Sequence, residues 1–222
     1  TGFGFTETVN YSFCSRRSAD RLRLGGQDPR RRTVALLNPL TEEQSVMRTT
    51  LASGLLETVY RNLSRQMRDL KIFEIGKVFL DNGGGRLPEE IEMLGGVHTG
   101  RRSAPAWRTA EAPCDFYDIK GAVEGLLEGL CIKEAAFTRV ADADGDYLRP
   151  GRSARILAAG HTLGVVGEVH PEVLRQYDID QPVFLFEMDL GTLHGQVPET
   201  ASARPIPRFP AVLRDITLIV DQ

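Results

Sequence analysis

Apolar side chains recur at helical spacing in two segments of the chain. Residues that lie three and four positions apart share one face of an α-helix. The pattern therefore predicts two amphipathic helices, over residues 47–67 and 119–130. The apolar positions of the first are Leu51, Leu55, Leu56, Val59, Leu63 and Met67, and those of the second are Ile119, Ala122, Val123, Leu126, Leu127 and Leu130. A shorter helix is expected over 171–177, where Pro171 suits the first turn.

Alternating or β-branched runs predict the strands. Residues 70–80 alternate and end at the glycine-rich turn 81–85, before a second run over 92–98, so this part is expected to form a long hairpin. The same criteria predict strands over 8–14, 34–37, 135–140, 154–158, 161–170 and 183–190. Hairpin-linked strands with few long helices favour an antiparallel sheet packed by helices, which is an α+β fold.

The C-terminal part reads as a separate unit. Pro198, Pro205, Pro207 and Pro210 fall close together and indicate a linker, and a strand-like run follows over 214–220. The chain lacks an initial Met and ends inside that run. We therefore expect a piece of a longer protein, cut shortly after a second domain begins.

Composition narrows the class of protein. The 222 residues are 41% hydrophobic and 26% charged, as in ordinary globular proteins, and the net charge of -3 gives no overall basic field for nucleic acid. The sequence contains no apolar stretch of 18 residues and does not start like a signal peptide, which favours a soluble, cytoplasmic protein. Cys14, Cys114 and Cys131 are widely spaced, so they suit a reducing compartment as buried or unreactive thiols and argue against a zinc site.

Motifs of catalysis or metal binding are missing from the sequence. The four histidines fall on different predicted elements without a ligand partner at the usual spacing, and hydrogen-bonding or capping roles are expected for them. Asp142, Asp144 and Asp146 lack the glycine and glutamate of a calcium loop, so they indicate an acidic turn. No phosphate-binding loop or nucleophile elbow occurs. From the residues we expect no catalytic, cofactor-binding or metal-binding site.

Arginine supplies 23 of the 27 cationic residues, and guanidinium groups bind phosphate well. A weak candidate for RNA contact is the set of Arg16, Arg17, Arg30, Arg31 and Arg32, although a solvated loop is the simpler interpretation. Arg48 differs, because it stands in an apolar stretch at the expected start of the first helix. A charge there is costly unless it is paired, so we expect a buried structural or interface ion pair.

Several segments carry recognisable motifs: GFGFTE (2–7), YSF (11–13), LNPLTEEQSVMRT (37–49), IFEIGKVF (72–79), FYDIKG (116–121), YLRPGRSA (147–154), FLFEMDL (184–190) and RFPAVLRDI (208–216). In this order they together resemble one family, the beta subunits of bacterial phenylalanine–tRNA ligases. Two departures are small: Arg149 stands where the family often has His, and Leu213 where a second basic residue is usual.

The resemblance implies a class II aminoacyl-tRNA synthetase-like antiparallel sheet flanked by helices over residues 1–199. Residues 200–222 resemble a linker and the first strand of a ferredoxin-like anticodon-binding domain. In this family the beta-subunit core is a degenerate copy of the catalytic domain that packs against the alpha subunit in an (αβ)2 heterotetramer. Asn38, Pro39, Glu43 and Arg48 match family motifs, and we expect them to support the fold or the subunit contact.

The sequence shows whether the residues that an active class II site needs are present. An active class II site needs an arginine and an acid on its second motif and a glutamate–arginine pair on its third, to hold ATP and its metal ions. The corresponding stretches here read LDNG at 80–83 and FEMDLG at 186–191, neither of which contains arginine. ATP chemistry within this chain is therefore not expected.

The expected function is a non-catalytic core of a phenylalanine–tRNA ligase. The parent complex would use ATP and Mg2+ to charge tRNA(Phe), with the alpha subunit as the direct partner and no membrane contact. Two alternatives stay open: an ATP-dependent ligase domain with unrecognised motifs, and a free-standing RNA-binding module that uses the arginines of 16–32.

Overall fold

A seven-stranded sheet forms the centre of the molecule in the computed structural model, which describes residues 2–104, 106–107, 111–132, 134–140 and 147–199 with Arg214 and Thr217. The strands lie in the order β1 (Thr6–Glu7), β4 (Leu70–Leu80), β5 (Glu89–Thr99), β9 (Val183–Asp189), β8 (His161–Val169), β7 (Leu148–Ala158) and β6 (Ala135–Arg139). Neighbouring strands are antiparallel except β1, which runs parallel to β4. This sheet confirms the predicted α+β class.

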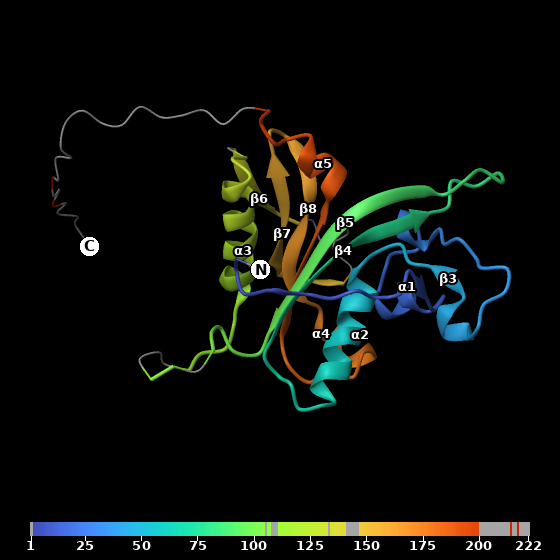
Figure 1. The fold of residues 1–222 in the computed structure, drawn as a ribbon, viewed down its shortest axis with the longest axis horizontal. Coiled ribbons are helices and arrows are strands. Elements are labelled where there is room, and N and C mark those ends of the chain that lie inside the picture. Colours follow the sequence, from blue (N-terminus) through green and yellow to red (C-terminus); the bar gives the residue numbers. More distant parts are fainter. Residues whose placement is uncertain are drawn as a thin grey trace.

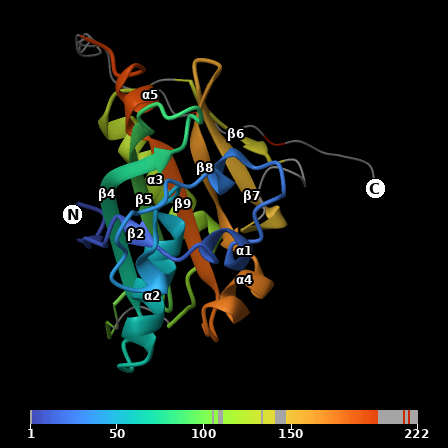
Figure 2. The same cartoon turned by 90° about the vertical axis from the view of Figure 1, so that its right-hand side faces the viewer.

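Helices cover both faces of the sheet. On one face lies α3 (Phe116–Gly129), and on the other lie α2 (Ala52–Leu63) and α4 (Pro171–Gln176) (Figure 1; Figure 2 shows the arrangement from the side). The described residues also form the short α-helices α1 (Ser18–Arg21) and α5 (Leu190–His194) and two 3-10 helices, η1 (Pro29–Arg31) and η2 (Glu42–Gln44). A separate ladder pairs β2 (Phe13–Cys14) with β3 (Val46–Met47) beside α1. The described helices are all too short or too polar to span a lipid bilayer.

Helix α3 has an N-terminal cap and an apolar face that both come from its own segment of the sequence. The Asp115 carboxylate accepts hydrogen bonds from the amides of Tyr117 and Asp118, and the Asp118 side chain accepts one from the amide of Asp115 in return, which is a capping box. Ile119, Val123 and Leu127 follow at intervals of four and are buried against the sheet. Their burial confirms the amphipathic helix that the sequence predicts here.

The helix α2 packs tightly over the middle of the sheet. Leu51, Leu55, Leu56 and Val59 are fully buried on this face. A Cβ atom at Gly95 on β5 would lie only 2.9 Å from Cδ1 of Leu55 and 3.3 Å from Cβ of Leu51. Glycine at this position therefore lets the helix approach the strand.

Most of the predicted strands are present. The hairpin of β4 and β5 pairs in unbroken register from Leu70 opposite Thr99 to Leu80 opposite Glu89. The strands expected near 135–140, 161–170 and 183–190 appear as β6, β8 and β9, and the helix expected at 171–177 appears as α4. The strand expected at 154–158 is β7, which begins earlier, at Leu148.

One N-terminal helix is confirmed with narrower bounds, and two N-terminal strand predictions are largely wrong. The helix expected over 47–67 starts later, because Met47 pairs with Phe13 in β3, and it ends before Gln66, whose backbone φ is 64°. Of the strand expected over 8–14, only Phe13–Cys14 is a strand, β2, since the Asn10 amide donates to the Glu74 side chain instead of to a ladder carbonyl. The strand expected over 34–37 is only an isolated bridge from Ala35 to Val46.

Other predictions lie largely or wholly outside the described residues. These are the acidic turn at 142–146, the linker that the clustered prolines indicate, and the strand over 214–220, of which Arg214 and Thr217 alone are described and lie in no helix or strand. The domain boundary near residue 199 stays a prediction.

The packing of α2 on Gly95 can be tested by truncation. We expect Leu55→Ala to lower the free energy of unfolding by about 2–5 kcal/mol, because it leaves a cavity between helix and sheet. Urea denaturation measures the change. Leu40→Ala is the matched control, since Leu40 is 92% exposed, and it should shift stability by less than about 0.5 kcal/mol. Equal effects of the two substitutions would contradict the packing described here.

Candidate functional site

Two buried carboxylates flank Gly95 in the middle of the sheet. The register places Glu74 of β4 opposite Gly95 of β5, and Gly95 opposite Glu187 of β9. Directly paired residues of antiparallel strands point to the same face, so Glu74, Gly95 and Glu187 form one line, here called the polar row. Glu74 is 1% exposed and Glu187 is 4% exposed. The row lies on the face that α2 covers.

Glu187 accepts hydrogen bonds from three donors in two parts of the chain. Its carboxylate accepts a hydrogen bond from the Leu51 amide at 2.7 Å, one from the Thr50 hydroxyl at 2.7–2.8 Å, and one from the Tyr147 hydroxyl at 2.7 Å. The helix α2 has no capping side chain at its own N-cap residue, Leu51. Glu187 therefore supplies the negative charge that a helix N-terminus favours, from a strand on the other side of the core.

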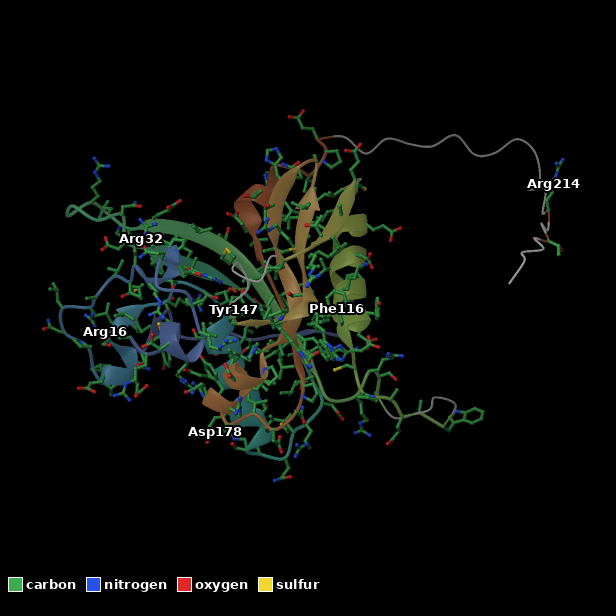
Figure 3. The ribbon with its side chains drawn as sticks, turned by 180° about the vertical axis from the view of Figure 1, so that it is seen from behind. Arg16, Arg32, Phe116, Tyr147, Asp178 and Arg214 are labelled. Carbon is green, nitrogen blue, oxygen red and sulfur yellow. The ribbon has the colours of Figure 1, made fainter. Side chains whose placement is uncertain are left out.

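Tyr147 stays protonated as a donor to this carboxylate. Burial and the negative charge of Glu187 raise the pKa of Tyr147 well above its ordinary value. The Arg30 guanidinium lies 5.2 Å from the centre of the Tyr147 ring. Figure 3 shows Tyr147 in the interior of the molecule. The Glu187 cluster thus joins β9, β7 and α2.

Glu74 makes the ion pair that the sequence predicts for Arg48. Nη1 of Arg48 donates to Oε1 of Glu74 at 2.6 Å, and Nε of Arg48 donates to the carbonyl oxygen of Lys77 at 2.8 Å. Asn10 adds its backbone amide and its side-chain amide to the same carboxylate. A Cβ atom at Gly76 would lie 2.1 Å from Nη2 of Arg48, so glycine there leaves room for the guanidinium. Arg48 lies between β3 and α2, not in the expected helix.

The other acids of the synthetase-like segments also have structural roles. Asp189 accepts a hydrogen bond from the amide of Thr192 and caps α5. Asp81 accepts one from the amide of Gly83 in the hairpin turn. Glu187, Asp189 and Asp81 are thus each bonded to backbone amides of neighbouring elements.

The polar row does not have the form of a nucleotide site. Its two carboxylates already accept hydrogen bonds from protein donors, and Leu51 and Leu55 fill the space over Gly95. A cavity beside Arg48 and Asn10 measures about 50 Å³. Within the described residues, His, Cys, Asp and Glu form no cluster of three or more that is suited to a metal ion. The residues of the row therefore do not fit ATP with its magnesium ions.

The family-motif residues predicted alongside Arg48 lie apart from the row. Asn38, Pro39 and Glu43 are exposed on the loop between α1 and β3. Leu37 and Leu40, on the same loop, are almost completely exposed. A role of Asn38, Pro39 and Glu43 in subunit contact stays a prediction.

The candidate RNA-contact arginines divide into two groups. Arg30 donates to both oxygens of Asp28, and Arg31 donates to the carbonyls of Leu24 and Gly25. Although burial opposes it, the hydrogen bond to Asp28 raises the pKa of Arg30 above its ordinary value. The second group, Arg16, Arg17 and Arg32, is exposed. Figure 3 shows Arg16 and Arg32 at the end of the molecule away from Phe116.

Two histidines have the hydrogen-bonding roles that the sequence indicates. His98 is buried with Nε2 3.1 Å from the carbonyl oxygen of Arg101, and burial lowers its pKa. His170 caps α4 by accepting a hydrogen bond from the amide of Glu172.

The three thiols differ from one another. Cys14, Cys114 and Cys131 are all unpaired. Burial raises the pKa of Cys114 to about 12. Cys131 is exposed, so burial does not account for this thiol, and its lack of reactivity stays a prediction.

Comparison with known proteins assigns the chain to a family. Residues 1–190 match the family model described as the phenylalanyl tRNA synthetase beta chain CLM domain. The chain belongs to this family. It is 41% identical over 219 residues to the phenylalanine–tRNA ligase beta subunit of Geobacter sulfurreducens, and 44% identical over 219 residues to that of Syntrophotalea carbinolica. In each comparison the match covers 99% of this chain and 27% of the relative, so the chain spans about a quarter of the relatives' length.

Solved structures confirm the class II synthetase-like fold. A pyrrolysyl-tRNA synthetase from Desulfitobacterium hafniense superposes with a TM-score of 0.63 at 17% identity, over 90% of this chain and 68% of that structure. A second structure, of PylSc from the same organism, gives a TM-score of 0.62 at 18% identity, over 87% and 62%.

Sequence reasoning missed the two acids of the polar row in this beta-chain domain and their partners Asn10 and Tyr147. Glu74 and Glu187 were not singled out, although each stands alone among apolar strand residues, in IFEI and LFEM. An acid in that position of a buried strand signals a satisfied charge, because an unpaired one is too costly there. Asn10 and Tyr147 carried no such signal, since their partners lie 64 and 40 residues away.

The Arg48–Glu74 pair can be tested by removing one partner. We expect Arg48→Ala to cost about 3–5 kcal/mol of unfolding free energy, because Glu74 keeps a buried charge without its cation. Chemical denaturation measures the loss. Arg68→Ala removes an exposed pair with Asp180 and should cost less than about 1 kcal/mol. The Arg48→Ala/Glu74→Gln double variant should lose less than the sum of its single changes, and additive losses would show that the two groups do not interact.

Proposed function

We propose that this chain is a non-catalytic core of a phenylalanine–tRNA ligase beta subunit that packs against the alpha subunit in an (αβ)2 enzyme. The complete cytoplasmic enzyme charges tRNA(Phe) with phenylalanine, using ATP and Mg2+ bound outside this chain. Similarity to named beta subunits over 99% of the chain supports the parent enzyme.

The polar row is the observation that supports a non-catalytic role. A class II catalyst keeps charged side chains available to the triphosphate and its metal ions. Here Glu187 caps a helix and Glu74 holds Arg48. Acids that serve as structural partners in this way cannot also receive a substrate without unfolding their surroundings. The domain thus has a class II synthetase-like fold in which the two central acids, Glu74 and Glu187, stabilise the structure.

An exposed apolar stripe at the sheet edge supports the subunit contact. Between β1 and β2, the even-numbered residues make contacts toward the interior. The Thr8 amide donates to the Phe73 carbonyl, and the Asn10 side chain donates to the Glu74 carboxylate. The Ser12 carbonyl accepts a hydrogen bond from the backbone amide of Arg48. The odd-numbered Val9, Tyr11 and Phe13 are 87%, 72% and 41% exposed and form what we call the edge stripe. Contiguous exposed apolar side chains are typical of protein interfaces. We propose that this stripe meets the alpha subunit.

Co-purification with the matching alpha subunit tests the contact. We expect the Val9→Asp/Tyr11→Asp double variant to bind alpha at least about tenfold more weakly, because it places two charges in an apolar interface. Leu87→Asp is the matched control, since Leu87 is also 87% exposed but lies in the hairpin turn, and it should bind like the unchanged chain. Retained binding by the double variant would exclude the stripe. A loss with Asn38→Ala/Glu43→Ala instead would place the contact on the loop before β3.

Pyrophosphate exchange tests the non-catalytic role. The chain alone should show no phenylalanine-dependent exchange between ATP and pyrophosphate, whereas the complex with alpha should exchange. Measurable exchange by the chain alone, abolished by Glu187→Gln, would show an active ligase domain and overturn the proposal.

A further inference from the structure

A groove opens beside the N-terminal turn of α3, on the sheet face opposite the polar row. Its volume is about 480 Å³, within the range of sites that hold small molecules or single residues of a polymer. We call it the α3 groove. Helix α3 and strand β6 supply much of its wall, with Lys120, Phe137 and Arg139 among the lining residues, and β7 and β8 supply Arg152 and Glu168.

Glu168, the acid at the base of the groove, is paired with more positive charge than its single carboxylate neutralises. Glu168 is 6% exposed, and its two oxygens accept hydrogen bonds from Nη1 of Arg149 and Nη1 of Arg152, each at 2.8 Å. Two guanidinium groups thus face one buried carboxylate. Each arginine side chain is also about half exposed, so the pair presents positive charge to the solvent.

At the rim, Asp115 and Asp118 share the guanidinium group of Arg102. Asp115 caps α3 and accepts a hydrogen bond from Arg102 at 2.6 Å. Lys120 lies over the Phe137 ring, 4.4 Å from its centre, and is paired with Glu124. Arg139 on β6 is exposed at the groove. The described lining residues thus include three cations, Lys120, Arg139 and Arg152, against two acids, Asp115 and Glu168, which favours an anion.

Aromatic rings stand beside these cations. Phe116 and Tyr117 lie edge to face with their ring centres 5.6 Å apart, and Tyr117 is 76% exposed. Figure 3 shows Phe116 at the start of α3. Exposed rings next to arginine are the arrangement by which proteins bind single-stranded nucleic acid, with bases stacked on the rings and phosphates on the cations.

We propose that the α3 groove binds one or two nucleotides of a single-stranded nucleic-acid segment, with a phosphate on Arg152 and a base stacked on Tyr117. An acidic peptide would use the arginines but would have less use for an exposed ring. The proposal goes beyond the scaffold function, and its test needs no alpha subunit, so each can fail without the other.

Fluorescence anisotropy with a labelled single-stranded RNA octamer of mixed sequence tests the groove. We expect Tyr117→Ala to weaken binding by about five- to a hundredfold while the slope of log affinity against log salt stays unchanged, because a stacking contact involves no counterion. Arg152→Gln should weaken binding and reduce that slope by about 0.7, the value for one phosphate contact on a single strand. Glu168 keeps Arg149 in this variant, and thermal unfolding verifies that it folds.

The controls decide between ligands. Tyr60→Ala removes a partly exposed tyrosine of α2, on the other face, and Arg68→Gln removes an exposed arginine that pairs with Asp180. Both controls should bind RNA like the unchanged chain. If Tyr117→Ala and Arg152→Gln both bind the RNA as tightly as the unchanged chain does, the proposal is overturned. A glutamate-rich peptide that binds more tightly than the RNA, and depends on Arg152 but not on Tyr117, would overturn it in favour of an acidic protein segment.

Discussion

The bond between the Glu187 carboxylate and the start of α2 is the constraint on which the rest of the structure depends. The Leu51 amide and the Thr50 hydroxyl donate to this carboxylate, so a central strand holds the end of a helix across the core. Tyr147, directly before β7, donates to the same group. A charge buried to this degree is stable only with several donors in fixed positions. The position of α2 over the sheet is therefore fixed by electrostatics as well as by apolar packing.

Glu74 continues this arrangement on the other side of Gly95. Through Arg48 and Asn10 it ties the N-terminal segment and the residues before α2 to β4. Between the two acids the sheet has no side chain, and Leu51 and Leu55 occupy the space. The start of α2 thus lies over Gly95, with the carboxylates of Glu74 and Glu187 on the two neighbouring strands. A ligand on this face would have to displace the same side chains that hold the core together.

Local periodicity was enough to predict the hairpin of β4 and β5 and helix α3, because their signals lie within the segments themselves. It failed at the start of α2, where Met47 belongs to a strand because its partner Phe13 lies 34 residues earlier. The candidate site shows the same limit. The pairing of Arg48 followed from the cost of a charge in an apolar stretch, but the identity of Glu74 depends on strand register. Register is set by tertiary contacts, so a local pattern does not reveal it.

The two faces of the sheet consequently differ in how many elements a substitution would disturb. On the α2 face, acids, helix ends and glycine positions constrain one another, so a change at any of them disturbs several elements. On the α3 face, the helix is held by its own capping box and by apolar contacts, and the cations beside its first turn exceed what Glu168 requires. We therefore expect recognition, as proposed above, at the edge stripe and the α3 groove, whereas the central acids stabilise the fold.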